Sequence, residues 1–279
     1  MAMPEGVPRI SVLPGAGLHF ARYAPDPDLR PVVESYWTLE VDRPPAVVTV
    51  IPDGLIDVTF DLGARPAVYV TGALTRPERY VHERPVGLLG VSLLPGAALP
   101  VLGTDVGSLP AGWTPLAEVV GPVADELAAR VAAAEPGPAR LALVDTFLAA
   151  RLVPPDRIDD RVRTALGAIL HRAGDVDVAA LARQAAASPR HLSRLFDAWV
   201  GMGPKRFARI VRVQAVLRHL AVDPGADLTE LATRLGFADH AHLTRQVRDL
   251  TGAPPTAVVA RLRADDPAVS FKPTPSGDP

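Results

Sequence analysis

The sequence predicts an α+β protein whose N-terminal part is a small antiparallel β-barrel with accessory helices and whose C-terminal part is entirely helical. Residues 29–101 hold short apolar segments between Gly and Pro breaks, a pattern typical of a small barrel or sandwich. From Pro115 onward the apolar residues follow the three-and-four spacing of helices. In addition, residues 188–255 contain two copies of one sequence motif, which predicts two helix–turn–helix units.

The N-terminal part is expected to form five strands after an irregular lead-in at residues 1–22. These strands are expected at 32–41, 47–51, 56–61, 68–71 and 86–94. In the third strand, apolar residues alternate with Asp57, Thr59 and Asp61, so that one face is apolar and the other polar. Asp53, Asp57 and Asp61 are therefore expected to lie on a solvated face.

The period of the apolar residues also locates the domain boundary. Two helices are expected within residues 116–152, packed against the barrel or against a second subunit. Val153-Pro154-Pro155 forms a short stiff linker, so we expect the barrel and its helices to occupy residues 1–153 and the all-helical domain residues 154–263. Residues 264–279 are rich in Pro, Asp and Ser and have little to bury, which predicts a disordered tail.

The repeat places equivalent residues 51 positions apart, as in Leu192 and Leu243, Arg194 and Arg245, Gly201 and Gly252, and Pro204 and Pro255. Ser188 and Asp239 are good N-cap residues for the second helix of each unit. Between the units, residues 204–220 predict a helix of roughly 17 residues, about 25 Å long. Such a rod can hold the two flanking helices about one turn of duplex DNA apart, ~34 Å.

Charge is distributed unevenly along the chain. Residues 157–263 contain 17 Lys and Arg against 10 Asp and Glu, whereas the remaining residues contain 12 against 21. A basic half joined to an acidic half is typical of a nucleic-acid-binding domain attached to a domain that does not bind nucleic acid. Chance clustering of surface arginines is the alternative explanation.

In each unit the second helix buries one face and leaves a polar face outside over its first two turns, as a DNA recognition helix requires. Arg is the side chain best suited to a bidentate contact with guanine or to clamping a phosphate. The residues expected to contact bases are Arg190, Ser193 and Arg194 in the first unit, and His240, Ala241, His242 and Arg245 in the second. The residues expected to contact phosphates are Lys205, Arg206, Arg209, Arg212 and Arg248.

Over about residues 158–263 the chain resembles the AraC-type transcription regulators. The resemblance rests on Leu181-Ala182 through Gly201-x-x-Pro204, and on Leu231-Ala-x-x-Leu-Gly-Phe-Ala-Asp-x-x-His-Leu-x-Arg with Gly252-x-x-Pro255. It implies that the first recognition helix does most of the base reading. One departure is Val247-Arg248, where the family usually has an aromatic residue before a basic one, so we expect a lighter core there.

The N-terminal part is similar to the cupin-like sensor domains that precede some of these regulators. The similarity rests on Trp37 and on Ile51-Pro-Asp-Gly54. It implies a cupin-like fold but no particular ligand.

Several classes of function are excluded or disfavoured. The 279-residue chain contains no cysteine, which excludes disulfides, thiolate metal sites and cysteine nucleophiles. Neither a long apolar run nor a secretory signal is present, so no membrane span is predicted and the cytoplasm is the expected location. No catalytic, cofactor or metal site is predicted. His82-Glu83 could form a metal pair in a barrel mouth, but a surface loop is preferred, and Trp37 is expected in the core.

These observations predict a sequence-specific DNA-binding transcription regulator that responds to a ligand through its N-terminal domain. The expected partners are double-stranded DNA, a small-molecule effector in the barrel, RNA polymerase if the protein is an activator, and a second copy in a homodimer. Two alternatives stay open: a metal-dependent cupin-type enzyme fused to a DNA-binding module, and a helical adaptor that binds protein. The basic excess and the outward arginines count against the adaptor.

Overall fold

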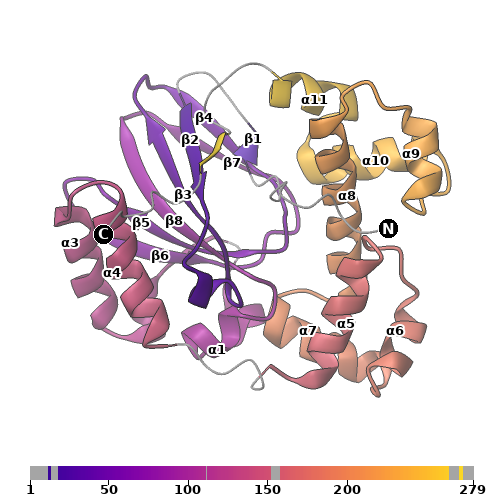
Figure 1. Cartoon of the computed structure of the whole chain (residues 1–279), viewed down its shortest axis with the longest axis horizontal. Coiled ribbons are helices and arrows are strands. Elements are labelled where there is room, and N and C mark those ends of the chain that lie inside the picture. Colours follow the sequence, from indigo (N-terminus) through magenta and orange to yellow (C-terminus); the bar gives the residue numbers. More distant parts are fainter. Residues whose placement is uncertain (1–11, 14–17, 111, 152–157, 264–269, 273–279) are drawn as a thin grey trace.

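The structure, a computed structural model, has the predicted α+β architecture and describes residues 12–13, 18–110, 112–151, 158–263 and 270–272. The β-rich N-terminal domain and the helical C-terminal domain lie side by side (Figure 1). Helix α8 (Pro204–Val222) runs along the length of the C-terminal domain and joins its two halves (Figure 1). None of the described helices is both long and apolar enough to cross a lipid bilayer.

Two sheets form the N-terminal domain, one of seven strands in the order β10-β2-β3-β8-β5-β6-β9 and one of three in the order β1-β4-β7. Every strand pair is antiparallel except β10 with β2. The strands are β1 Val12–Leu13, β2 Leu18–Tyr23, β3 Val33–Val41, β4 Ala46–Val50, β5 Ile56–Asp61, β6 Ala67–Thr71, β7 Glu78–His82, β8 Val86–Leu93, β9 Trp113–Pro115 and β10 Ser270–Lys272. Phe20, Leu39, Val48 and Leu88 form an apolar core contributed by strands of both sheets.

Short helices pack on the other face of the large sheet. They are η1 Pro27–Leu29, α1 Ala98–Leu102, η2 Val106–Ser108, α2 Leu116–Val120, α3 Val123–Ala133 and α4 Pro138–Ala149. Val58 and Phe60 of the sheet share a buried cluster with Leu127 and Val144 of the helices. Three helices, not the predicted two, fill residues 116–152, because Gly121 with a φ of +84° is followed by a proline and ends α2.

The structure corrects the prediction for both ends of the chain. The lead-in was expected to be irregular, but part of it forms β2, an inner strand of the large sheet. The tail was expected to be disordered, but Ser270–Lys272 forms β10, which pairs in parallel with β2. The predicted linker at 153–155 lies outside the described residues.

Seven helices make up the C-terminal domain. They are α5 Asp160–His171, α6 Val178–Gln184, α7 Pro189–Val200, α8, α9 Leu228–Arg234, α10 His240–Thr251 and α11 Pro255–Arg263. The predicted caps are confirmed, since Ser188 Oγ accepts from the His191 N–H at 3.2 Å and Asp239 Oδ1 from the His242 N–H at 2.6 Å. Gly201, with a φ of +77°, ends α7 in the left-handed conformation that glycine favours.

The two domains share buried contacts. Ile51, which follows β4, is 1 % exposed and belongs to the hydrophobic core of the C-terminal domain. The buried side chain of Gln214 on α8 donates from Nε2 to the carbonyl oxygen of Pro52 at 2.9 Å. Gly201, at the end of α7, packs so closely that a Cβ there would lie 2.9 Å from Val106 in η2.

Candidate nucleic-acid interface

The first recognition helix, α7, presents all three of its predicted base-contacting residues to solvent. Arg190, Ser193 and Arg194 are exposed, whereas Leu192 and Phe196 on the opposite face are fully buried. The Ser188 cap and the proline after it fix where the helix begins, and therefore which side chains occupy its first two turns.

The second recognition helix, α10, presents three of its four predicted base-contacting residues. His240, Ala241 and Arg245 are exposed. His242 is half-buried and lies edge-on to the ring of Phe237, with 5.6 Å between ring centroids.

Hydrogen bonds hold His242 within its own unit. Its Nδ1 accepts from the Ala238 N–H at 3.2 Å, and its Nε2 lies 2.6 Å from Nε2 of the Gln246 side-chain amide. Because Nδ1 accepts, Nε2 of the neutral ring carries the proton, and the Gln246 amide must turn its oxygen toward that proton. Both ring nitrogens are therefore engaged, and the structure assigns His242 to fixing the start of α10. His242 is therefore not among the proposed base contacts.

A groove beside α8 is lined by some of the predicted DNA-contacting residues from both helix–turn–helix units. Ser193 of α7 and His242 of α10 line it, with Lys205, Arg206 and Arg209 of α8 between them. Both helices therefore border one basic groove, α7 through Ser193 and α10 through His242 and Gln246. This placement agrees with two recognition helices that serve one DNA face.

The predicted phosphate contacts divide into two groups. Lys205, Arg206 and Arg248 are exposed. Arg209 is partly exposed and makes an ion pair of 2.5 Å with Asp249, which is itself exposed. Because such a surface pair contributes little stability, a phosphate can compete for this guanidinium.

Arg212 differs, because its guanidinium joins two turns of the domain. It donates to the carbonyl oxygens of Gly174 at 2.7 Å and Gly236 at 2.9 Å, and it lies 5.5 Å from the ring centroid of Phe237. It was predicted to contact phosphate, but these bonds favour a structural role, since a phosphate contact would require breaking them.

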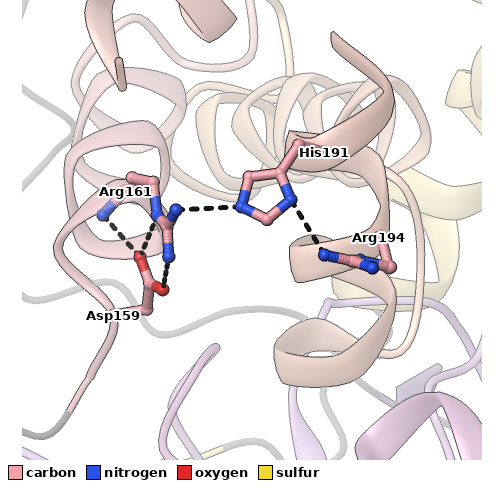
Figure 2. Close-up of polar contacts among 4 residues, drawn as sticks. All are labelled: Asp159, Arg161, His191 and Arg194. Carbon is pink, nitrogen blue, oxygen red and sulfur yellow. Dashed lines mark hydrogen bonds and ion pairs between the residues drawn. The ribbon is translucent and has the colours of Figure 1, made fainter. Parts of the chain in front are cut away.

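A chain of polar contacts, not foreseen from the sequence, leads to Arg194 (Figure 2). Asp159, the N-cap residue of α5, accepts from the Arg161 side chain at 2.9 and 2.5 Å. This pairing lowers the pKa of Asp159. Arg161 Nη1 lies 2.9 Å from His191 Nε2, and Arg194 Nη2 lies 3.1 Å from His191 Nδ1.

The two arginines compete for the imidazole of His191. A guanidinium only donates hydrogen bonds, and a neutral imidazole has a single accepting nitrogen. His191 can therefore accept from Arg161 or from Arg194, but not from both at once. When it accepts from Arg161, the Arg194 guanidinium is free to turn toward DNA.

A second candidate site is a pocket between the two sheets, with a cavity volume of about 70 Å³. Its apolar walls include Trp37, Tyr80 and Trp113, and its polar lining includes Asp53 and Asp57. The expected solvated face of aspartates is therefore wrong for these two residues. Trp37 lines the pocket, and the predicted loop at His82 is strand β7, whose last residue also lines it.

The carboxyl group of Asp57 is held by two donors, at 3.1 Å from Trp37 Nε1–H and at 2.6 Å from Ser92 Oγ–H. Burial, followed by the nearby charge of Asp53, raises its pKa to about 6, and the two hydrogen bonds and Arg22 partly offset this rise. Within the described part of the chain, no group of three or more His, Asp or Glu side chains is arranged to hold a metal ion.

Two family models match the chain. Residues 181–261 match a helix-turn-helix domain, and residues 21–111 match a domain of unknown function, DUF6597. A search of curated proteins found no significant match.

Several solved structures are similar to parts or most of the chain. A probable AraC family transcriptional regulator from Rhodopseudomonas palustris is 26 % identical over 37 % of this chain and 97 % of its own, with a TM-score of 0.33. ToxT from Vibrio cholerae is 8 % identical over 92 % of this chain and 97 % of its own, with a TM-score of 0.44. A ToxT structure with a bound unsaturated fatty acid is 10 % identical over 91 % and 95 %, with a TM-score of 0.39.

The helix-turn-helix match, the two capped recognition helices and the basic groove define a DNA-binding protein of the helix–turn–helix class. The paired units and their Gly-Phe turn at 236–237 are the features on which the resemblance to AraC-type transcription regulators rests, and the helix-turn-helix match over residues 181–261 agrees with it. The match favours DNA binding over the adaptor alternative.

Proposed function

We propose that the protein reads its operator with both recognition helices, placed in successive major grooves on one face of the duplex. In this proposal the base contacts come from Arg190, Ser193 and Arg194 of α7 and from His240, Ala241 and Arg245 of α10. The phosphate contacts come from Lys205, Arg206, Arg209 and Arg248, and these supply most of the salt-dependent affinity.

The groove that both helices border is the observation that carries this proposal. Two recognition helices on opposite sides of the domain could not contact one duplex together. Here α8 separates the helices and contributes the exposed cations Lys205 and Arg206 between them. A phosphate backbone lying along these cations would place a major groove at each end of the rod.

We further propose that the N-terminal domain senses a small molecule and passes the signal through the segment 51–55. Asp53 and Leu55 line the barrel pocket. Ile51 and Pro52 connect β4 to this part of the pocket. The Pro52 carbonyl accepts the hydrogen bond from Gln214, and Ile51 is buried in the core of the C-terminal domain. A ligand that shifts this segment must therefore disturb α8, which carries both recognition helices.

The remaining partners follow from the same role. A homodimer would present two such domains to a longer operator, and RNA polymerase would be a partner if the bound protein activates transcription. A protein that regulates bacterial-type promoters acts where the chromosome lies, so the cytoplasm is part of the proposal.

Selection of binding sites from random duplex DNA tests the operator proposal. The wild-type protein should enrich a site with two preferred blocks about 10 base pairs apart, roughly one turn of B-DNA. Arg194→Ala should lose the preference at one or two positions of one block and keep the other. Enrichment of no sequence, or of one short block alone, would contradict simultaneous reading by both units.

A further inference from the structure

The barrel pocket has a composition that limits what it can bind. Its lining combines aromatic side chains, aliphatic side chains from both sheets and the carboxylates of Asp53 and Asp57. The lining residues include neither Lys nor Arg, the side chains that are positively charged at neutral pH. The one titratable base among them is His82, and burial lowers its pKa, which favours the neutral ring.

Asp57 reaches the pocket because the strand alternates. Val58 and Phe60 of β5 belong to the cluster beneath helices α3 and α4, whereas Asp57 and Thr59 line the pocket on the opposite face. Both donors to the Asp57 carboxyl group bind the same oxygen, Oδ1. The other oxygen, Oδ2, receives no hydrogen bond from the residues that the structure describes.

The nearest internal cation does not neutralise this carboxylate. Arg22 is buried, lies 3.4 Å from Glu34 and is 5.5 Å from the ring centroid of Phe20. Its charge opposes the rise in the pKa of Asp57, but burial and Asp53 outweigh it. The Asp57 carboxyl group therefore keeps one oxygen, Oδ2, with which a positive ligand can pair.

The aromatic walls add a second feature that favours a cation. Trp37 lies over Gly90, where a Cβ would come within 1.9 Å of the indole, so glycine is required for the ring to lie flat against the sheet. Trp113 lies edge-on to both Tyr69 and Tyr80, with ring centroids 5.2 and 5.9 Å apart. The faces of Trp and Tyr rings attract cations, most strongly where water is excluded.

We propose that the barrel pocket binds an organic cation, a protonated amine with an apolar or aromatic body. The ammonium group donates to the Asp57 carboxylate beside Asp53, and the body lies among Trp37, Tyr80 and Trp113. This inference rests on the proposed sensor function, since it names the chemical class of its effector.

Three probes that share one skeleton and differ in charge test the proposal: 4-phenylbutylamine, 4-phenylbutanol and 4-phenylbutyrate. Calorimetry and thermal shift with the full chain at pH 7.5 should show the amine binding at least about tenfold more tightly than the alcohol, and the acid more weakly than both. Tighter binding of the acid, equal binding of all three, or binding of none at millimolar concentration would overturn the proposal.

Variants locate the effect. Asp57→Asn keeps an oxygen that can accept from Trp37 and Ser92 but removes the charge, so it should abolish the advantage of the amine and leave alcohol binding unchanged. Asp61→Asn is the matched control, because Asp61 lies on the same strand but outside the pocket lining, and it should behave like the wild type. An amine preference that survives Asp57→Asn would contradict the proposed counterion.

The outcome can be separated from that of the proposed function. If the alcohol or the acid binds the pocket and changes operator affinity, the sensor function stands and only the class of ligand is wrong. If the amine binds as expected but operator affinity never responds, the ligand class stands and the proposed signalling fails.

Discussion

The two helix–turn–helix units repeat one motif but are held in different ways. The first recognition helix, α7, contacts α1 and η2 of the N-terminal domain along its own length, and Gly107 of η2 lies directly against Asp197. The second helix, α10, approaches that domain at its C-terminal end, where Gly252 lies close to Pro77, and the following helix α11 contacts β1. The orientation of the first helix is thus tied to the N-terminal domain, and we expect an effector in the proposed pocket to act more directly on the first unit.

The turns of the two units differ as well. At the equivalent position of each turn the backbone has a positive φ, +49° at Ala186 and +71° at Gly236. The first turn therefore bears the strain of a side chain in a left-handed conformation, whereas the second turn avoids it. The second turn is in addition bound by Arg212 through the Gly236 carbonyl. We infer that the second unit is the more rigid of the two.

Exchanging these turn residues should give the largest effect. Gly236→Ala adds a Cβ about 2.4 Å from the Asp175 carboxyl group, and together with the backbone strain we expect a loss of ~2–4 kcal/mol in the free energy of unfolding. Ala186→Gly should instead be neutral or stabilise by up to ~1 kcal/mol. Chemical denaturation measures both. Equal losses for the two variants would show that the turns are equivalent.

Substituting the equivalent arginines distinguishes how each unit binds DNA. Arg194→Ala should weaken a specific site by roughly 1–3 kcal/mol and relax one base preference. Arg245→Ala should cost less and relax a base preference in the other half of the site, because the first recognition helix is expected to do most of the base reading. Fluorescence anisotropy with specific and scrambled duplexes measures both losses. A uniform loss for Arg194→Ala would identify that residue as a phosphate contact.

Cutting the link to the N-terminal domain tests the coupling of the first unit. Gln214→Leu leaves the Pro52 carbonyl without its buried donor, so we expect a loss of ~1–3 kcal/mol in the free energy of unfolding. It should also weaken the response of operator affinity to any pocket ligand. Gln184→Leu, an exposed substitution on α6, is the control. An unchanged ligand response in a folded Gln214→Leu protein would exclude the proposed route.

The smallest effect is expected from His191, whose ring contacts both Arg161 and Arg194. His191→Ala should release that side chain, and ordering it on DNA would then cost about 0.5–1 kcal/mol, a few-fold loss of specific affinity. His171→Ala, at an exposed site on α5, should have no effect. Tighter specific binding by His191→Ala would mean that the contact restrains Arg194 away from DNA.

Local signals explain which features the sequence could predict. The caps at Ser188 and Asp239 and the buried faces of α7 and α10 depend on residues within one or two turns, and they were predicted correctly. The alternation of apolar and polar residues along β5 predicted two faces, but it could not show that Asp57 faces a pocket between the two sheets. Closure depends on the pairing of distant strands, which no local pattern encodes.

Contacts between distant residues account for the other differences. His242 was expected to point outward, but its contact with Phe237 and the Ala238 N–H turns it inward. Asp159 and Arg161 lie about 30 residues before His191, so the contact of Arg161 with His191 depends on how α5 packs beside α7. The one local hint was a capping aspartate at the start of a basic helix.

Methylation protection of guanine N7 in a selected operator tests most directly whether both recognition helices occupy one face of the duplex together. The account predicts two clusters of protected guanines about one helical turn, ~10 base pairs, apart on the same face. Arg194→Ala should remove protection in one cluster while the other persists. A single protected cluster, or two clusters on opposite faces of the duplex, would contradict the account.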